Sequence, residues 1–408
     1  MFEIKKILSQ YITDKDELET NNMILDLVDD VSKKEIEPFA REMDRHGVKL
    51  ENGKVIVHPQ VHKIINVLKQ NELFGLTVPE KYGGAEMGAT IQNTVMERFS
   101  RADASTSLYH ALQGTAVEMM KKYASEELKE KYFPKIAKGE RLVGLLYSEP
   151  NSGSDLGSLR TKAVREGDKY IVNGNKIWIS SAGIVNSYTT LLQTDPSKGS
   201  RGLTAFVIDA DQPGFKVDRI EEKLGLHASP TGAIALENAE IPVENMIGEE
   251  GKGFSAVLYG LASSRIGIAA QAVGIADAAY RKAVAYASER EQFKTKISDF
   301  QANQFKIAEM ATRIHLARNY YVYASRLKEN EQDFGMEASL AKAYAGDMAQ
   351  YVTYEAIQLH GGYGFTVEYD VERYYRDARI TSIYEGTNEV QRIVIARSEI
   401  PKHSKKDN

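Results

Sequence analysis

Residues 382–389, with the sequence SIYEGTNE, contain a carboxylate in an unexpected place. Glu385 directly follows the apolar-rich run of residues 380–384 and precedes Gly386. A positioned glutamate can act as a general base, and this is one interpretation of the residue. The other is structural: the helix dipole stabilises an acid at a helix start by a few tenths to about one kcal/mol, with Thr387 as the N-cap. Taken alone, the segment favours the structural interpretation.

Two segments in the middle of the chain could contact a flat ligand. Residues 145–158, LLYSEPNSGSDLGS, run from an apolar strand into a cluster of small polar residues, where the backbone can approach a ligand and offer hydrogen bonds. Trp178, the only tryptophan, is followed two residues later by Ser180, so that an indole and a hydroxyl could flank a planar cofactor. The plainer explanations are a polar loop and core filling, and each segment taken alone favours them.

Three further polar features give weaker evidence of a functional site. Arg290, in SEREQFKTKISDFQ, lies near a helix end and faces either the helix dipole or a pyrophosphate. The stretch GEEGKG at 248–253 lacks the glycine order of a dinucleotide site and is interpreted as a link between domains. His58 and His62 have no third ligand nearby, and the chain has no cysteine, so no metal site is expected and disulfides and thiol nucleophiles are excluded.

Three zones of different periodicity must position these residues, and they predict an α+β protein that is mainly α. Residues 1–142 have apolar residues at helical spacing and predict an N-terminal helical domain. Residues 143–252 predict a middle β-barrel-like domain, with a hairpin at Asn173-Gly174. Residues 253–408 predict a C-terminal four-helix bundle, with helices near 254–289, 299–328 and 335–360 and a last one starting near Thr387.

The composition excludes several classes of partner. The 408 residues, 42% hydrophobic and 27% charged, are typical of a globular protein of two or three domains. The net charge of −5, with both signs interspersed, argues against a nucleic-acid partner or an anionic membrane. Neither a targeting peptide nor a transmembrane span is expected, so we predict a cytoplasmic protein of bacterial type, with a mature mitochondrial-matrix protein as the alternative.

Several motifs, taken in order, resemble the acyl-CoA dehydrogenase family. They are LLYSEPNSGSD, NGNKIWIS, SSRIGIAAQAVGIA, EREQFKTKI, QLHGGYGF and YYRDARITSIYEGTNEVQR. The likeness runs from about residue 20 to the C-terminus and is strongest to the short-chain, butyryl-CoA-like members. It implies an N-terminal helical domain, a β domain and a C-terminal four-helix bundle, with FAD bound between the last two.

The resemblance implies an FAD site made of two groups of residues. The group by the isoalloxazine ring comprises Leu145, Tyr147, Ser148, Gly153, Ser154, Trp178, Ile179 and Ser180. Thr387 and Glu389 fall where the family also contacts FAD. The group by the adenine and pyrophosphate comprises Arg290, Gln292, Phe293, Gln301, Gln358, Gly361 and Gly362. Because this second half resembles a site built across a dimer, a homotetramer arranged as a dimer of dimers is expected.

The resemblance also implies that Glu385 is the catalytic base. It would remove the α-proton of an acyl-CoA while the β-hydrogen leaves as hydride to flavin N5, giving a trans-2-enoyl-CoA. The thioester oxygen would be held by the backbone N–H of Glu385 and a ribityl hydroxyl. Some members carry the base directly before the arginine matching Arg265, but that position is Ser264 here, which favours Glu385. The implied substrate contacts are Ser154, Arg265, Tyr384, Glu385, Gly386 and Arg397, with Tyr109 and Gln113 lining the acyl pocket.

The departures from the family pattern bear on the substrate. Bulky side chains at Tyr109, His110 and Gln113 would favour a short, branched or cyclic acyl chain, and Ser107, at the place of the arginine of glutaryl-specific members, argues against a dicarboxylyl chain. Ala262 stands where many relatives carry Asp or Asn facing the pantetheine, so that contact differs here. An electron-transfer flavoprotein would reoxidise the flavin. Enoyl-CoA reduction, an oxidase-type reaction and a non-catalytic member of the fold remain alternatives.

Overall fold

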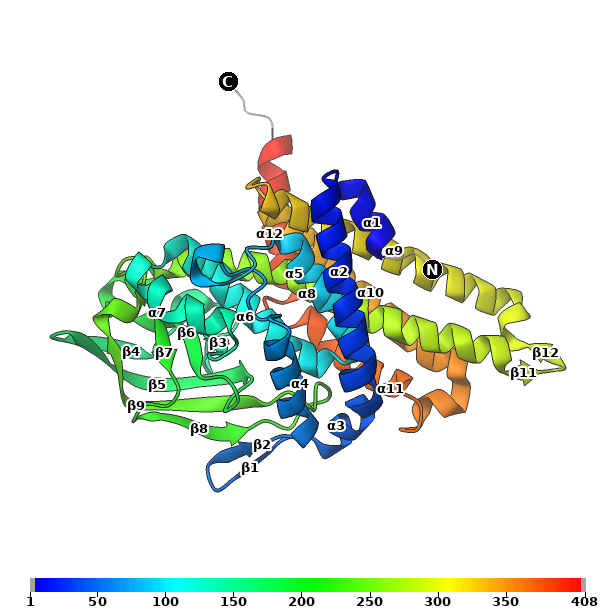
Figure 1. Cartoon of the computed structure of the whole chain (residues 1–408), viewed down its shortest axis with the longest axis horizontal. Coiled ribbons are helices and arrows are strands. Elements are labelled where there is room, and N and C mark those ends of the chain that lie inside the picture. The colour runs from blue at the N-terminus through cyan, green and yellow to red at the C-terminus, as the bar shows by residue number, and fades with distance from the viewer. Residues whose placement is uncertain (1–3, 405–408) are drawn as a thin grey trace.

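The computed structural model describes residues 4–404, which form a helical N-terminal part, a sheet and a set of long helices in that order (Figure 1). This is the mainly α, α+β architecture that the periodicity predicts. The long helices occupy the centre of the molecule in Figure 1, and the sheet lies to one side of them. The core is continuous across these parts, because buried residues of all three pack in one hydrophobic cluster.

The N-terminal part is built mainly from α-helices. Within the described residues they are α1 (Ile4–Tyr11), α2 (Lys15–Val31), α3 (Ala40–His46), α4 (Pro59–Gln70), α5 (Ala89–Ala102), α6 (Ala104–Tyr123) and α7 (Glu126–Ala137), with a small hairpin of β1 (Lys49–Glu51) and β2 (Lys54–Ile56). Asp103 separates α5 from α6: its carboxylate accepts the Thr106 N–H at 2.8 Å as an N-cap. Both helices are buried over most of their length and pack against the C-terminal helices.

The middle of the chain forms one mixed sheet. Its strands are β3 (Val143–Leu146), β4 (Lys162–Glu166), β5 (Lys169–Ser180), β6 (Ser187–Gln193), β7 (Leu203–Asp209), β8 (Phe215–Ile220), β9 (Thr231–Pro242) and β10 (Met246–Ile247). They lie in the order β10-β7-β6-β4-β5-β9-β8, and β3 pairs with β6 in parallel. The remaining pairings are antiparallel except for a single β4–β6 contact. Because β3 pairs with β6, it ends beside the middle of the sheet.

The hairpin predicted at Asn173-Gly174 is wrong. Strand β5 runs straight through these residues, and the turn between β4 and β5 falls at Gly167, which has φ +66°. Gly174 instead marks a register shift in the pairing of β5 with β9. A Cβ there would meet the Thr161 side chain at 2.6 Å, so glycine is required by close packing at a bulge rather than by a turn.

The C-terminal part contains the long helices that the sequence predicts. They are α8 (Gly253–Glu289), α9 (Gln301–Glu329), α10 (Gly335–His360), α11 (Val371–Ala378) and α12 (Asn388–His403), with the short hairpin β11 (Glu291–Gln292) and β12 (Thr295–Lys296) between α8 and α9. The expectation that no segment reaches the composition of a membrane span is wrong for α8, which is long and apolar enough. Since 67% of its apolar 18-residue stretch is buried inside the protein, α8 is the central helix of the core.

Candidate active site

Glu385 lies in a strained turn rather than in the first turn of a helix. The turn joins a short 3₁₀ segment, Arg379–Ser382, to α12, and Thr387 caps α12 by accepting the Val390 N–H at 3.3 Å. The backbone of Glu385 has φ +54°, a left-handed conformation that disfavours residues with a Cβ. Strain of this kind costs on the order of 1–3 kcal/mol and persists only where the surroundings hold it.

Two buried side chains hold this turn in place. The ammonium of Lys342, on α10, donates to the Gly386 carbonyl at 2.7 Å and to the Asn388 Oδ1 at 3.1 Å. The Gln391 amide donates to the same Gly386 carbonyl at 2.9 Å and to the Glu385 carbonyl at 3.4 Å. Lys342 and Gln391 are both fully buried, so the clamp is part of the core.

The carboxylate of Glu385 is a stronger base than an ordinary surface glutamate. Burial raises its pKa, and the hydrogen bond from Ser264 together with the positive charges of Arg265 and Lys342 limits the rise. The Ser264 hydroxyl donates to Oε2 at 2.6 Å. Arg265 is 9% exposed and donates to the Ser339 hydroxyl at 3.3 Å, while its Nε has no partner within residues 4–404. The site therefore combines a base with cations that are near it but not bonded to it.

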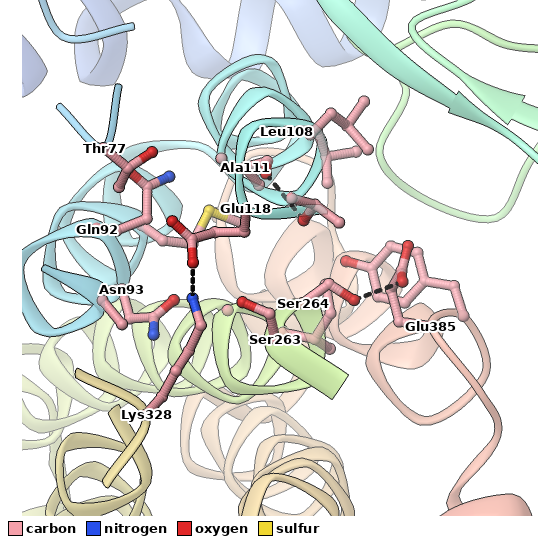
Figure 2. A pocket seen from close by; sticks show the side chains of 18 of the residues that line it. Thr77, Gln92, Asn93, Leu108, Ala111, Glu118, Ser263, Ser264, Lys328 and Glu385 are labelled. Atoms are coloured by element: carbon pink, nitrogen blue, oxygen red, sulfur yellow. Dashed lines mark hydrogen bonds and ion pairs between the residues drawn. The ribbon is translucent and has the colours of Figure 1, made fainter. Parts of the chain in front are cut away.

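A cavity opens directly onto Glu385 and Ser264 between α5, α6 and α8 (Figure 2). Ser180, at the end of β5, and Tyr384 also line it, so the sheet and the turn that carries Glu385 meet at its edge. Apolar side chains form part of the wall: Met96, Leu108, Ala111, Leu112 and Ile268. Most of the remaining wall is polar and carries the side chains of Gln92, Asn93, Glu118 and Lys328.

The α6 residues expected in the pocket lie elsewhere. The Tyr109 side chain is buried and directs its hydroxyl to the Ala228 carbonyl at 3.5 Å. Gln113 bridges the backbone of Arg141 and Val143 and so fixes the start of β3. The face of α6 that lines the cavity is instead the neighbouring one, which carries Leu108, Ala111, Leu112, Thr115 and Glu118 at helical spacing. One residue for which the sequence offers no signal, Gln271, sets this orientation: its side-chain amide donates to the buried Ser107 hydroxyl and accepts from the Tyr384 hydroxyl.

Beside the cavity, the end of β5 carries an exposed aromatic side chain. Trp178 has φ +61° and lies in a register shift between Lys176 and Ile179, where β5 departs from regular pairing with β9. Its side chain is 59% exposed although the residues on either side of it are buried. Trp178 therefore does not fill the core: the bulge turns its side chain outward, and bulges of this kind commonly aim a side chain at a functional site.

A buried ion pair joins the end of β3 to β5. Lys176, with no exposed surface, donates to the Glu149 carboxylate at 2.9 Å and to the Tyr147 carbonyl at 3.0 Å. Glu149 also accepts the N–H groups of Arg160 and Thr161 at 2.7 and 3.0 Å. Burial lowers the pKa of Lys176 to about 8. The pair fixes the loop of residues 148–154 against the strand that carries Trp178 and Ser180, and the sequence alone did not indicate it.

The loop itself is open and polar. Ser148 is half-buried, whereas Gly153 and Ser154 are exposed, and a Cβ on Gly153 would meet no atom within 4 Å. Leu145, Tyr147 and Ile179 are buried, and the Tyr147 hydroxyl bonds Thr189 at 2.8 Å. These residues lie at or just beyond the ends of β3 and β5, and of the residues expected by the isoalloxazine ring only Ser180 lines the cavity.

A second groove brings together five of the seven residues expected around the adenine half of FAD. Arg290, Gln292, Gln358, Gly361 and Gly362 line it. The Arg290 guanidinium lies over the Tyr363 ring at 5.5 Å, and Cβ atoms on Gly361 or Gly362 would meet nothing within 4 Å. Phe293 and Gln301 are exposed and lie outside the groove lining. Phe293 and Lys294 form the tip of the β11–β12 hairpin, with φ +53° and +62° as in a type I′ turn.

Two expected residues lie on α12, beyond the turn that carries Glu385. Glu389 and Arg397 are both exposed on that helix. The pKa of Glu389 is lowered, chiefly by hydrogen bonds from its own N–H and from Thr387. The structure therefore leaves both charged groups accessible to a ligand that reaches the Glu385 turn from outside.

Comparisons with known proteins agree over most of the chain. Acyl-CoA dehydrogenase family models match as an N-terminal domain over residues 18–140, a middle domain over 144–239 and a C-terminal domain over 251–400. An acyl-CoA dehydrogenase of Bacillus subtilis is 40% identical over 378 residues, covering 92% of this chain and 96% of that protein. A 3-(aryl)acrylate reductase of Clostridium sporogenes is 39% identical over 382 residues, covering 93% and 98%. The solved structure of butyryl-CoA dehydrogenase from Megasphaera elsdenii matches with a TM-score of 0.88 at 35% identity, covering 93% of this chain and 98% of that one.

The chain therefore belongs to the acyl-CoA dehydrogenase family, a family of flavoprotein oxidoreductases that use FAD. This confirms the resemblance that the motifs indicated, and with it the enzyme class and the fold.

Proposed function

We propose that this protein oxidises the α,β-bond of a short, branched or cyclic acyl-CoA to the trans-2-enoyl-CoA, with Glu385 as the base. The observation that carries the proposal is the carboxylate itself. It is held in a strained, clamped turn, its pKa is raised by burial, and it opens onto a cavity with a partly apolar wall. A raised pKa makes a glutamate a better acceptor for the weakly acidic α-proton of a thioester.

The backbone of the same turn supports the developing enolate. No hydrogen bond from the Glu385 or Gly386 N–H to any residue in 4–404 is present. Unpaired N–H groups beside the base can donate to the thioester oxygen as negative charge grows on it. Ser264 keeps the carboxylate in one orientation, and the positive charges of Arg265 and Lys342 limit the rise of the pKa of Glu385.

The residues beside the cavity fit a flavin. Trp178 offers a flat exposed face, Ser180 offers a hydroxyl at the cavity edge, and the loop at Gly153 and Ser154 leaves its backbone accessible. FAD, when bound, supplies the acceptor for the hydride that leaves the β-carbon. The contribution of this chain is to present the substrate between that acceptor and Glu385 and to exclude water from the α-carbon.

The second groove supports a site shared between two chains. Arg290 follows Arg265 by 25 residues along α8, which corresponds to about 37 Å along the helix axis. Figure 1 shows the β11–β12 hairpin on the side of the molecule away from the sheet. The groove therefore serves the FAD of a second copy of the chain, and the exposed Phe293 is the contact it offers there. A dimer of such pairs makes the homotetramer expected from the resemblance.

An electron-transfer flavoprotein is the proposed oxidant of the reduced enzyme. The reverse direction is the second candidate, because a relative with 39% identity is named a 3-(aryl)acrylate reductase. In that direction Glu385 would donate the α-proton rather than accept it, with the same geometry.

An anaerobic titration of the purified holoenzyme tests the proposal. Straight, branched and cyclic acyl-CoAs are added and the flavin absorbance is followed. We expect bleaching by at least one short acyl-CoA, and recovery of the colour on adding an oxidised electron-transfer flavoprotein. A protein that stays colourless with added FAD, or a flavin that no acyl-CoA reduces, would overturn the proposal. Reoxidation by enoyl-CoAs but no reduction by acyl-CoAs would favour the reductase.

A further inference from the structure

The wall of the cavity opposite Glu385 is polar, and its hydrogen-bonding groups are partly unused. Figure 2 shows Glu385 and Ser264 on one side and the side chains of Thr77, Gln92, Asn93, Glu118 and Lys328 on the other. We call these five residues the polar wall. They come from α5, α6, α9 and the segment before α5, so the cavity touches charged and amide groups contributed by several elements.

The neutral members of the polar wall lack partners for part of their hydrogen-bonding capacity. Within residues 4–404, the Gln92 side-chain amide and the Thr77 hydroxyl make no hydrogen bond, and Asn93 uses only its Nδ2, which donates to Ser325 at 2.9 Å. Thr77 is 2% exposed and Asn93 7% exposed, whereas Gln92 is half-buried, and all three line the cavity. Polar groups that face a cavity without a protein partner are suited to bind a ligand.

The charged members of the polar wall are already paired. Lys328 contacts the Glu118 carboxylate, and Lys121 approaches the same carboxylate at 3.3 Å. Burial alone would raise the pKa of Glu118, but the two lysines lower it, so the carboxylate stays ionised and neutralises Lys328. The polar wall therefore offers no unpaired cation to a ligand carboxylate, which would instead lie near the ionised Glu118.

We infer that the acyl group carries a neutral hydrogen-bonding substituent, a hydroxyl or a carbonyl, at the end distant from the thioester. Gln92 can both donate to and accept from such a group, and Thr77 can do the same. The apolar side chains Leu108, Leu112 and Ile268 cover the carbon chain between that group and Glu385. A plain alkyl chain of the same length would bury the polar wall without satisfying it. Sites built to bond a polar group discriminate strongly against the analogue that lacks it. The inference rests on the proposed acyl-CoA function and names its substrate class.

Binding to the Glu385→Gln holoenzyme tests the inference without turnover. The probes are CoA thioesters of four to six carbons in three matched forms: ω-hydroxy, unsubstituted alkyl and ω-carboxy. Calorimetric titration gives each dissociation constant. We expect the best ω-hydroxy thioester to bind about tenfold more tightly than its alkyl counterpart, the effect of one or two neutral hydrogen bonds. Alkyl chains that bind equally or more tightly would overturn the inference, and so would ω-carboxy chains that bind most tightly.

Two variants and one control locate the effect, each made in the Glu385→Gln background. Gln92→Leu and Thr77→Val remove polar groups of the wall without changing charge, and each should reduce the ω-hydroxy preference to about twofold or less. Thr77→Val replaces a buried hydroxyl that has no partner, so we expect the fold to be kept and its melting temperature unchanged or raised. Met96→Leu changes the apolar side of the same cavity and should keep the preference; loss of preference only in that variant would overturn the inference.

The outcome also separates this inference from the proposed function. Binding and flavin bleaching by alkyl acyl-CoAs, with no ω-hydroxy preference, would overturn the inference and leave the proposed function standing. Failure of every thioester to bind or to bleach the flavin would overturn both.

Discussion

Replacing Lys342 by methionine should impair catalysis far more than stability. Its ammonium makes two hydrogen bonds to the turn, to the Gly386 carbonyl and the Asn388 Oδ1. Each charge-assisted bond contributes about 1.5–3 kcal/mol, but burial lowers the pKa of Lys342 to about 8, so desolvation of the ammonium offsets much of that gain. We therefore expect Lys342→Met to lower the free energy of unfolding by only about 1–2 kcal/mol.

The effect on turnover should be larger because the turn loses its clamp. Glu385 keeps φ +54° only while its surroundings hold it, and a displacement of about 1 Å at a reacting group costs on the order of 100-fold in rate. We expect kcat to fall by that order with a smaller change in KM. The charge of Lys342 also limits the raised pKa of Glu385, so without it that pKa rises further. The acid limb of the pH–rate profile, where the base becomes protonated, should move to higher pH.

Lys223→Met is the matched control. Lys223 also donates to a backbone carbonyl, that of Ser229 at 2.8 Å, and burial lowers its pKa to about 8, while its acidic neighbours are Asp377 and Glu221 rather than Glu385. In the unfolded chain each lysine has its ordinary pKa of 10.5, whereas in the folded protein its pKa is about 8. Between these pH values the unfolded chain binds more protons than the folded protein, so the free energy of unfolding of the unaltered protein should rise relative to that of either variant as the pH rises from about 8 to 10.5. Only Lys342→Met should shift the pH–rate profile. An unshifted profile with normal kcat in Lys342→Met would refute the positioning role.

Three other substitutions test the buried ion pair, the β11–β12 hairpin and the N-cap of α12. Glu149→Gln leaves the buried Lys176 ammonium without its counter-charge, so we expect chemical denaturation to show a loss of about 3 kcal/mol and the purified protein to hold less FAD; full FAD content would contradict the proposed role of this pair. Phe293→Ser removes the exposed tip of the β11–β12 hairpin and should weaken both self-association in sedimentation and FAD retention, whereas an unchanged tetramer would argue against a shared site. Thr387→Ala removes the N-cap of α12 and should cost about 1 kcal/mol of stability, measured by thermal unfolding, with a loss near zero counting against the cap.

The long helices were predictable because their signals are local. The helix expected at 335–360 is found as Gly335–His360, ended by Gly361 with φ +60°, and Thr387 caps α12 as expected. The turn expected at Asn173-Gly174 is absent, because the local sequence does not distinguish two uses of glycine. A glycine required at a bulge and a glycine required in a hairpin turn have the same local signature, and only the contact of Gly174 with Thr161, thirteen residues away, distinguishes them.

The orientation of α6 and the clamp of the Glu385 turn depend on distant residues. Tyr109 and Leu108 are adjacent in sequence, yet only Leu108 lines the cavity, because one residue turns a helix by about 100°. Lys342 reaches Gly386 across 44 residues, and nothing in the helix that carries it indicates the contact except a lysine among small apolar neighbours. The proposed role of Glu385 as the base comes from the resemblance alone, whereas its strained backbone and its raised pKa come from tertiary packing.

A single-turnover experiment on Glu385→Gln tests most directly whether Glu385 is the base. The variant holoenzyme is mixed anaerobically with the acyl-CoA that best bleaches the unaltered enzyme, and binding and flavin absorbance are recorded together. We expect binding within a few-fold of the unaltered enzyme and a bleaching rate lower by about 1,000-fold or more, since a general base contributes on the order of 10²–10⁴ and the glutamine cannot accept the proton. Bleaching at a near-normal rate would contradict the assignment of Glu385 as the base.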